Sequence, residues 1–134
     1  MPIALRVVSV ERSLFEGDVD FIVANGADGE LGILPRHAAL MTILKPGALK
    51  IQHGGNEELL FVGGGFLEVL PDRVTVLADI AEHADEISVE RAEEARQRAQ
   101  EKLAGTLTAS EELEFQNALA LAEARLRLAR TRRG

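Results

Sequence analysis

The chain has 134 residues, no cysteine and a formal net charge of −7. The lack of cysteine excludes disulfides, thiolate catalysis and cysteine-based zinc sites, and the acidic balance argues against a nucleic-acid partner, which needs a basic face. No apolar run approaches the roughly 20 residues that cross a bilayer, and the first residues lack the features of a signal peptide. We therefore expect a small protein that does not insert into lipid and stays where it is made.

Residues 1–86 are expected to form β-structure. Short runs rich in Val, Ile, Leu and Phe alternate with turn signals, at a spacing of roughly 8 to 12 residues. The runs are IALRVVSV, VDFIVAN, ELGIL, ALMTIL, ALKIQ, ELLFVG, GFLEVL and RVTVLA, and the turn signals include Glu16-Gly17-Asp18, Asn25-Gly26, Asp28-Gly29, Pro46-Gly47, Gly54-Gly55 and Pro71-Asp72. No long helical run lies between them. This pattern favours an antiparallel sandwich or barrel over a parallel α/β fold.

Residues 87–134 follow a helical pattern. Residues 88–104 contain no Gly or Pro and are rich in helix formers, with Ser88 placed to cap the start and Gly105 to end the helix. A second helix is predicted over residues 109–130, where Thr108 and Glu111 have the spacing of a capping box. Because the connection is short, the two helices should form an antiparallel hairpin. The predicted domains are thus a β-sandwich, residues 1–86, and a helical hairpin, residues 87–134.

The predicted seam between the two helices is thin. Its first side consists mostly of alanine, and each buried CH₂ contributes only about 0.8 kcal/mol. The expected seam residues are Val89, Ala92, Ala95, Ala99 and Leu103 on the first helix and Phe115, Ala118, Leu119, Ala122, Leu126 and Ala129 on the second. A hairpin held by such a seam is expected to be marginal and able to open; an ordinary, permanently closed hairpin is the alternative interpretation.

Five arginines gather at the end of the chain: Arg125, Arg127, Arg130, Arg132 and Arg133. Basic side chains suit a helix C-terminus because they oppose its dipole. Five arginines within nine residues exceed that requirement, which indicates an acidic partner for this basic tip. A solvated helix end is the alternative interpretation.

The chain shows no convincing catalytic motif. GADGELG lacks the Gly-Lys-Ser/Thr of a P-loop and the helix that would follow a dinucleotide loop, and VGGGFLEV is better explained by turns and close backbone approach. The histidines His37, His53 and His83 share no metal-ligand spacing. No Ser, His and acid set is supported by a motif such as G-x-S-x-G. We therefore predict no catalytic residue, no metal and no enzymatic activity for the chain by itself.

Several motifs together point to a family. GELGILPRHAAL, LKPGAL and GGGFLEVLPDRVTVLAD, followed by an Ala-, Glu- and Arg-rich helical hairpin, resemble the ε subunit of bacterial F-type ATP synthase. The resemblance covers nearly the whole chain and implies a sandwich of about ten short strands in two sheets. It also implies a sandwich that binds the γ subunit and the polar loops of the c-ring and helps couple proton translocation to ATP synthesis. Catalysis then lies on other subunits. In some members of the family the hairpin extends along γ and blocks ATP hydrolysis, and we expect the basic tip of this chain to meet the catalytic α and β subunits in that form.

The resemblance gives a role to the segment GELGILPRHAAL. By similarity, it lies against the c-ring and γ, and Gly29 and Gly32 are expected to form tight turns that push Glu30 outward. The residues expected at this contact are Glu30, Leu31, His37 and Ala38. A solvated turn carboxylate is the alternative interpretation of Glu30.

A second site is implied in the hairpin. Several members of the family bind regulatory ATP through an I/L-D-x-x-R-A motif, and this chain has ISVERA, so Ser88 replaces the acidic residue. Arginine suits phosphate because its planar donors pair with the phosphate oxygens. The residues that match or lie nearest to the ATP-binding positions are Glu82, Ile87, Ser88, Arg91, Ala92, Arg98 and Arg125. The alternative function is therefore an ATP-sensing module whose hairpin switches between folded and extended forms; otherwise Ser88 is only a helix cap.

The resemblance also implies where the protein works. Membership of the complex places the chain at the cytoplasmic face of the bacterial plasma membrane, as a peripheral protein. A plastid-encoded origin is the alternative. No cofactor other than regulatory ATP is expected.

Overall fold

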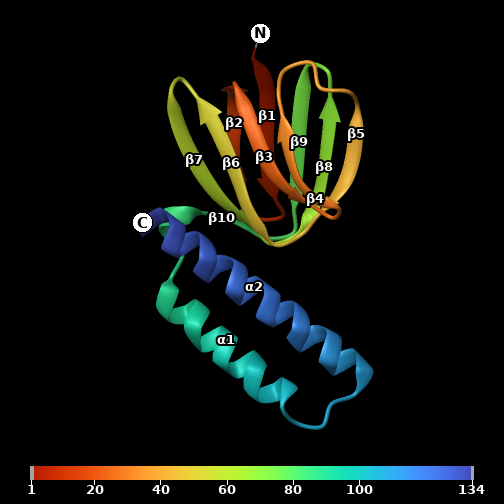
Figure 1. Ribbon diagram of the computed structural model, residues 1–134, viewed down its shortest axis with the longest axis vertical. Helices are drawn as coiled ribbons and strands as arrows, with labels where there is room; N and C mark the ends of the chain where they lie inside the picture. Colours follow the sequence, from red (N-terminus) through yellow and green to blue (C-terminus); the bar gives the residue numbers. More distant parts are fainter. Residues whose placement is uncertain (1, 134) are drawn as a thin grey trace. The chain divides into compact units, whose positions relative to one another are not determined.

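The computed structural model describes residues 2–133, with side chains for residues 2–131. The chain divides after His83 into two compact units, called here the sandwich unit and the helical unit (Figure 1). This division comes three residues before the predicted boundary. The reason is the short 3-10 helix η1 (Ala84–Glu86), which packs against the second helix, α2 (Ala109–Arg133), rather than continuing the strands.

The sandwich unit contains ten strands. They are β1 (Ile3–Ser9), β2 (Ser13–Val19), β3 (Phe21–Gly26), β4 (Gly29–Ile33), β5 (Leu40–Leu44), β6 (Gly47–His53), β7 (Asn56–Val62), β8 (Gly65–Leu70), β9 (Arg73–Ala78) and β10 (Ala81–His83). The eight predicted runs all contribute strands. The turn predicted at Glu16-Gly17-Asp18 is wrong, because these residues lie inside β2, where Glu16 pairs with Arg6 and Gly17 with Leu5.

The strands form two layers joined at one corner. Hydrogen bonding follows the order β10-β7-β6-β3-β5-β8-β9-β1-β2, with β4 paired to β3. The link between β3 and β5 is a single register pair, Gly26 with Leu44. It separates a five-stranded layer of β10, β7, β6, β3 and β4 from a second of β5, β8, β9, β1 and β2. The prediction of a sandwich with about ten strands is confirmed. The link between β3 and β5 joins the two layers at one corner, so the sandwich is nearly closed.

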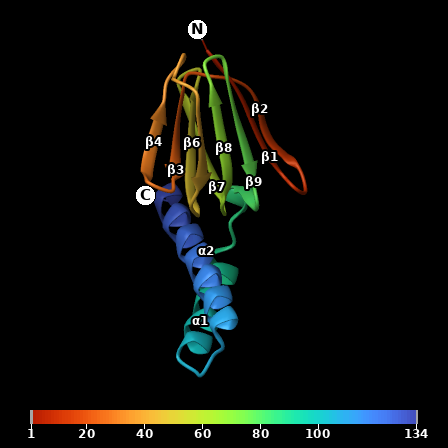
Figure 2. The same cartoon turned by 90° about the vertical axis from the view of Figure 1, so that its right-hand side faces the viewer.

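The layers differ from the expected pattern in one pairing. β1 and β9 run parallel, whereas every other neighbouring pair of described strands is antiparallel. In the side view, β3 and β4 lie at one side of the sandwich and β1 and β2 at the other (Figure 2). The parallel pair arises because the first strand of the chain inserts between β2 and β9.

The core of the sandwich lies between the two layers and is made of alternate strand residues. It contains Ile3, Leu5, Val7, Leu14, Val19, Ile22, Ala24, Ile33, Leu44, Leu49, Ile51, Leu60, Val62, Leu67, Val69, Val74, Val76 and Ala78. The period of two places the residues between them on the outer faces. Those outer faces carry the surfaces considered below.

Two glycines of the contact segment have different roles. Gly29 follows the turn after β3 and has a φ of 127°. Residues with a side chain rarely adopt this conformation. Gly32 forms no turn, and that prediction is wrong: it pairs with Val23 inside the ladder. Its close neighbour is the ring of Phe21, which would lie 3.2 Å from an added Cβ. Glycine there allows a large side chain on the adjacent strand.

The helical unit is an antiparallel hairpin of α1 (Val89–Leu103) and α2 (Figures 1 and 2). Ser88 caps α1, because its Oγ accepts a hydrogen bond from the Arg91 amide. The capping box at the start of α2 is reciprocal: the Thr108 amide donates to Glu111 and the Glu111 amide donates to the Thr108 hydroxyl, each at 3.1 Å. The Thr108 amide and hydroxyl hold the pKa of the Glu111 carboxyl below its usual range. Both predicted caps are confirmed.

The seam of the hairpin follows the predicted stripes. Every predicted seam residue is at least half-buried, and on α1 the two fully buried members are Ala92 and Ala99. On α2, Ala124 and Leu128 are also buried although they lie outside the predicted stripe. The α1 side of the seam is therefore as poor in buried apolar volume as its sequence indicates.

Candidate functional site

The predicted contact residues lie in one stretch at the edge of the first layer. Glu30 and Leu31 belong to β4, which pairs only with β3 in the part of the chain that the structure describes. Glu30 is exposed opposite Asn25. His37 and Ala38 follow in the loop between β4 and β5. This edge exposes a carboxylate and an open strand to any partner.

Backbone hydrogen bonds hold the loop that carries His37. The Arg36 amide donates to the Pro71 carbonyl at 3.1 Å, and the His37 amide donates to the Leu34 carbonyl at 3.2 Å. Nδ1 of His37 lies 2.8 Å from the Ala38 carbonyl oxygen. Arg36 takes a positive φ of 65°, and the Leu34 side chain is 61% exposed. The loop is thus preorganised and offers an apolar side chain to solvent.

A larger apolar surface lies on the outer face of the second layer. Ile43 on β5, Phe66 on β8 and Leu77 on β9 are each more than half exposed. The ladder pairs Ile43 with Phe66, Phe66 with Leu77 and Leu77 with Val8. We call these four residues the apolar row; at a strand spacing of about 4.8 Å it runs for roughly 14 Å. Aligned exposed apolar side chains of this kind are typical of an interaction surface.

The apolar row was not predicted from the sequence. ALMTIL and GFLEVL carry apolar residues at both odd and even positions, which is the signal of a strand covered on both faces. In the structure only one of those faces meets the core. The apolar residues at odd and even positions of these runs therefore lie on two different faces, and the second face is uncovered.

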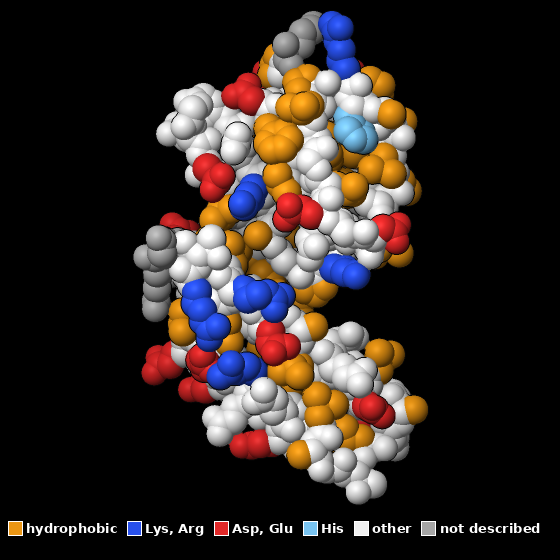
Figure 3. Space-filling view, in the orientation of Figure 1, with side chains coloured by type: hydrophobic (Ala, Val, Ile, Leu, Met, Phe, Trp, Pro, Cys, Tyr) orange, Lys and Arg blue, Asp and Glu red, His pale blue; other side chains and the backbone are white. Residues whose placement is uncertain are grey.

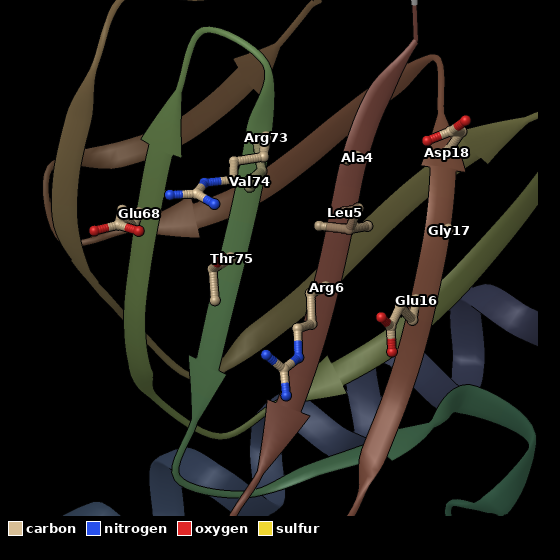
Figure 4. A pocket seen from close by; sticks show the side chains of 10 residues that line it. All are labelled: Ala4, Leu5, Arg6, Glu16, Gly17, Asp18, Glu68, Arg73, Val74 and Thr75. Atoms are coloured by element: carbon tan, nitrogen blue, oxygen red, sulfur yellow. The ribbon is translucent and has the colours of Figure 1, made fainter.

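Charged side chains lie beside the apolar row. Two residues further along the strands, the ladder brings Glu68, Thr75, Arg6 and Glu16 into register across β8, β9, β1 and β2. They surround an open hollow of about 500 Å³. Figure 4 shows Glu68 on β8, the arginines over β9 and β1, and the acids of β2 on the far side. We call Glu68, Arg73, Arg6, Glu16 and Asp18 the charged strip.

The proposed nucleotide positions divide between the two units. Glu82 belongs to β10, and the other candidates belong to the helical unit. Ile87 and Ala92 are buried, Ser88 serves as the helix cap, and Arg125 on α2 is half-buried. Arg91 and Arg98 are exposed on α1, and within the described part of the chain neither guanidinium has an ion-pair partner. The first turn of α1 therefore unites a capped N-terminus with an unpaired arginine.

The basic tip lies in the last turns of α2. Arg127 and Arg130 are exposed; the side chains of Arg132 and Arg133 lie outside the described residues. Figure 3 shows basic side chains gathered on the visible face of the hairpin. Arg130 approaches Glu93 of α1 at 3.8 Å, and Glu93 also pairs with Arg96. This contact between the helices was not predicted, since it depends on how the two helices align.

The remaining polar side chains of the described residues are exposed or half-buried. Among the described side chains, no polar or charged residue is fully buried. Glu58 lies 3.6 Å from Nε2 of His53 and 3.4 Å from Nδ1 of His83, at the partly exposed rim of the core. No group of three or more His, Asp or Glu residues within the described ranges could hold a metal. No described helix has the length and hydrophobicity needed to cross a membrane.

The chain thus belongs to the class of proteins that join a ten-stranded sandwich, here with an exposed apolar row, to an antiparallel helical hairpin. Comparison with known proteins identifies the class more closely. Residues 2–84 match the family model for the ATP synthase delta/epsilon chain β-sandwich domain, and residues 85–130 match the model for its long α-helix domain. The chain belongs to the epsilon chains of the ATP synthase delta/epsilon family, and the predicted resemblance is confirmed.

Full-length relatives support this assignment. The ATP synthase epsilon chain of Dehalococcoides mccartyi is 48% identical over 134 residues, covering 96% of this chain and 93% of the relative. The epsilon chain of Herpetosiphon aurantiacus is 43% identical, covering 99% and 98%. That of Desulforamulus reducens is 54% identical over 99 residues, covering 74% and 75%. The similarity therefore spans both units.

Two solved structures share the fold at low sequence identity. A chain in the Euglena gracilis mitochondrial ATP synthase structure of OSCP, F1 and c-ring has a TM-score of 0.82 at 24% identity, covering 92% of this chain and 78% of that one. A chain in the Tetrahymena thermophila central stalk and c-ring structure has a TM-score of 0.72 at 15% identity, covering 96% and 97%. The architecture is thus retained where the sequence has diverged widely.

Proposed function

We propose that this chain is a rotor component of the central stalk, with its sandwich unit bound to the γ subunit and to the polar loops of the c-ring. In this position it couples proton translocation to ATP synthesis and carries no catalysis itself. The protein works at the cytoplasmic face of the bacterial plasma membrane, as a peripheral component of the complex. The observation that carries the proposal is the apolar row, which a monomer would leave in water.

The docking role follows from the uncovered surfaces of the sandwich unit. Ile43, Phe66 and Leu77 are 58%, 51% and 53% exposed, so covering them removes apolar area from water at a gain of about 25 cal/mol per Å². The Glu30 edge and the His37 loop supply a second surface of different, polar character. Two surfaces of unlike chemistry suit two partners, an apolar one for the shaft and a polar one for the loops of the ring.

The hairpin is proposed to inhibit ATP hydrolysis when it opens and extends toward the catalytic α and β subunits. The alanines of α1 hold the closed form weakly, and the basic tip would meet acidic side chains in the open form. Arg130, paired with Glu93 in the closed hairpin, would become available to such a partner. This proposal needs no change in the sandwich unit.

The test uses the catalytic complex freed of its own epsilon subunit. The full chain and a chain of residues 1–83 are added separately, and binding and ATP hydrolysis are both measured. We expect both to bind and only the full chain to slow hydrolysis. Equal hydrolysis rates with both bound would show that the hairpin is passive, and failure of both to bind would remove the rotor assignment.

ATP sensing by the hairpin is a second candidate function. It is supported by the unpaired guanidiniums of Arg91 and Arg98, seven residues apart on α1, which leave their donors free for phosphate. Ser88 weakens the case, because it stands where the motif has an acid and serves as the cap. ATP titration of the full chain, compared with Arg91→Ala and Arg98→Ala, tests the idea. Binding that is absent at millimolar ATP, or unchanged in both variants, would refute it.

A further inference from the structure

The charged strip has an ordered alternation of sign. Glu68 of β8 gives a negative edge, Arg73 of β9 and Arg6 of β1 give a positive centre, and the acids of β2 give a second negative edge (Figure 4). The ladder fixes this order, since Glu68 pairs with Thr75, Thr75 with Arg6 and Arg6 with Glu16. Strands β8, β9 and β1 also carry the apolar row, two residues further along.

The two arginines of the strip are not used within the chain. Arg6 lies directly opposite Glu16 in the ladder, and Arg73 stands beside the acid of β8, yet neither guanidinium forms an ion pair or hydrogen bond in the part of the chain that the structure describes. Both side chains are exposed at the hollow. A guanidinium offers five donors in a planar fork that matches a carboxylate. The centre of the strip is therefore open to an acidic side chain from outside.

We propose that the charged strip sets the register in which the partner docks on the apolar row. This inference rests on the proposed function, with the γ subunit as the partner. The partner places an acidic side chain over Arg6 and Arg73 and basic side chains over Glu68 and the β2 acids. The apolar row supplies most of the affinity, whereas the alternating charges select one alignment and speed the encounter.

The continuity of the two surfaces supports this occupant. Along a strand, every second residue lies on the same face at a spacing of about 6.6 Å, so Phe66 and Glu68 are neighbours, as are Leu77 and Thr75. A protein surface that covers Phe66 and Leu77 also reaches the hollow. A small free anion would bind poorly there, because three carboxylates surround the two arginines. The alternation instead matches a surface that carries both signs.

The experiment measures binding to the catalytic complex lacking its own epsilon subunit, over a series of salt concentrations. The variants are Arg6→Gln, Arg73→Gln and the double variant. The matched control is Lys50→Gln, which removes an equal charge from an exposed position on β6 in the other layer. Phe66→Ser tests the apolar row itself. Far-UV circular dichroism of each variant checks the fold. Substitution of the exposed arginines should not change it.

Each arginine variant should slow association at low salt by roughly two- to fivefold, the range expected for exposed charge pairs, and should flatten the salt dependence. Lys50→Gln should leave both unchanged. If Phe66→Ser weakens binding while the double arginine variant behaves like Lys50→Gln, the charged strip has no docking role and the proposed function stands. If neither Phe66→Ser nor the double variant affects binding, the partner docks elsewhere, and both this inference and the role of the apolar row are wrong.

Discussion

Gly65 and Gly29 share nearly the same backbone conformation but have different surroundings. Their φ values are 131° and 127°. A Cβ added to Gly65 would overlap the carbonyl oxygen of Leu77 and lie 2.9 Å from Cα of Ala78, whereas one added to Gly29 would meet nothing within 4 Å. The pair Gly65→Ala and Gly29→Ala therefore separates the cost of the backbone conformation from the cost of contact.

The magnitudes follow from these two situations. Gly29→Ala should cost about 1–3 kcal/mol, because alanine must adopt a sparsely populated conformation. Gly65→Ala carries the same cost and adds an overlap with backbone, which flexible side-chain motion cannot relieve. Overpacking costs about 1–3 kcal/mol, and separating β8 from β9 at the pairs of Gly65 with Ala78 and Phe66 with Leu77 loses hydrogen bonds worth about 1 kcal/mol each. The total of roughly 4–8 kcal/mol is comparable with the full stability of a small domain.

Urea unfolding of the full chain, followed by far-UV circular dichroism, provides the measurement. At equal slopes, we expect the midpoint of Gly65→Ala to fall below that of Gly29→Ala by at least about 1 M, given slopes of about 1–3 kcal/mol per M. Hydrogen exchange should show the added loss in β8 and β9. Equal midpoints for the two variants would refute the argument, because they would show that the contact with Leu77 costs nothing.

Three further predictions concern the helical unit. Glu93→Gln should speed hydrogen exchange in α1 and α2 by a few-fold, because it removes the ion pairs with Arg96 and Arg130, each worth about 0.2–1 kcal/mol. Glu94→Gln, exposed on the same helix, is the control and should change nothing. Thr108→Ala removes the hydroxyl but keeps the backbone amide, so it should return the pKa of Glu111 only part of the way toward its ordinary value in a carboxyl NMR titration. Since the folded-state pKa is lowered, this carboxylate stabilises α2 above its unfolded pKa and loses that effect as the pH falls through the folded pKa. The variant should show a weaker pH dependence of exchange at the start of α2. Ser88→Asp should tighten ATP binding while keeping the cap, and unchanged titration curves would count against an ATP site at this turn.

The elements of this fold that could be predicted from sequence are those determined locally. Both helix caps depend on hydrogen bonds across three residues, Ser88 to Arg91 and Thr108 to Glu111, so residue type and spacing are sufficient. Strand β2 was missed because Glu16-Gly17-Asp18 has turn composition, which an edge strand tolerates. The direction of β1 beside β9 could not be predicted, since a period of two is the same in parallel and antiparallel strands.

The surfaces were harder to predict than the elements, for a related reason. Exposure of Phe66 and Leu77 depends on whether another layer covers that face, and the composition of a strand does not decide this. The contact of Glu93 with Arg130 joins residues on different helices and requires the relative alignment of both. The Glu30 and His37 segment was predicted from a motif, and its contact with a partner stays a prediction.

The two units differ in how strongly their own residues hold them together, and this difference decides which one can move. The sandwich core contains 18 buried apolar residues, including Leu5, Ile22 and Leu67, and ladder hydrogen bonds connect its strands. On α1 only Ala92 and Ala99 are fully buried, and at about 0.8 kcal/mol for each methyl-sized group they contribute roughly 2 kcal/mol. Arg96 adds a cost, because its buried Nε has no partner among the described residues. A ligand shifts an equilibrium only by its differential affinity for the two states. Under the proposed function, acidic side chains that bind the basic tip more tightly in the open form would shift the hairpin toward opening. The larger core of the sandwich unit would keep that unit folded while the hairpin moves.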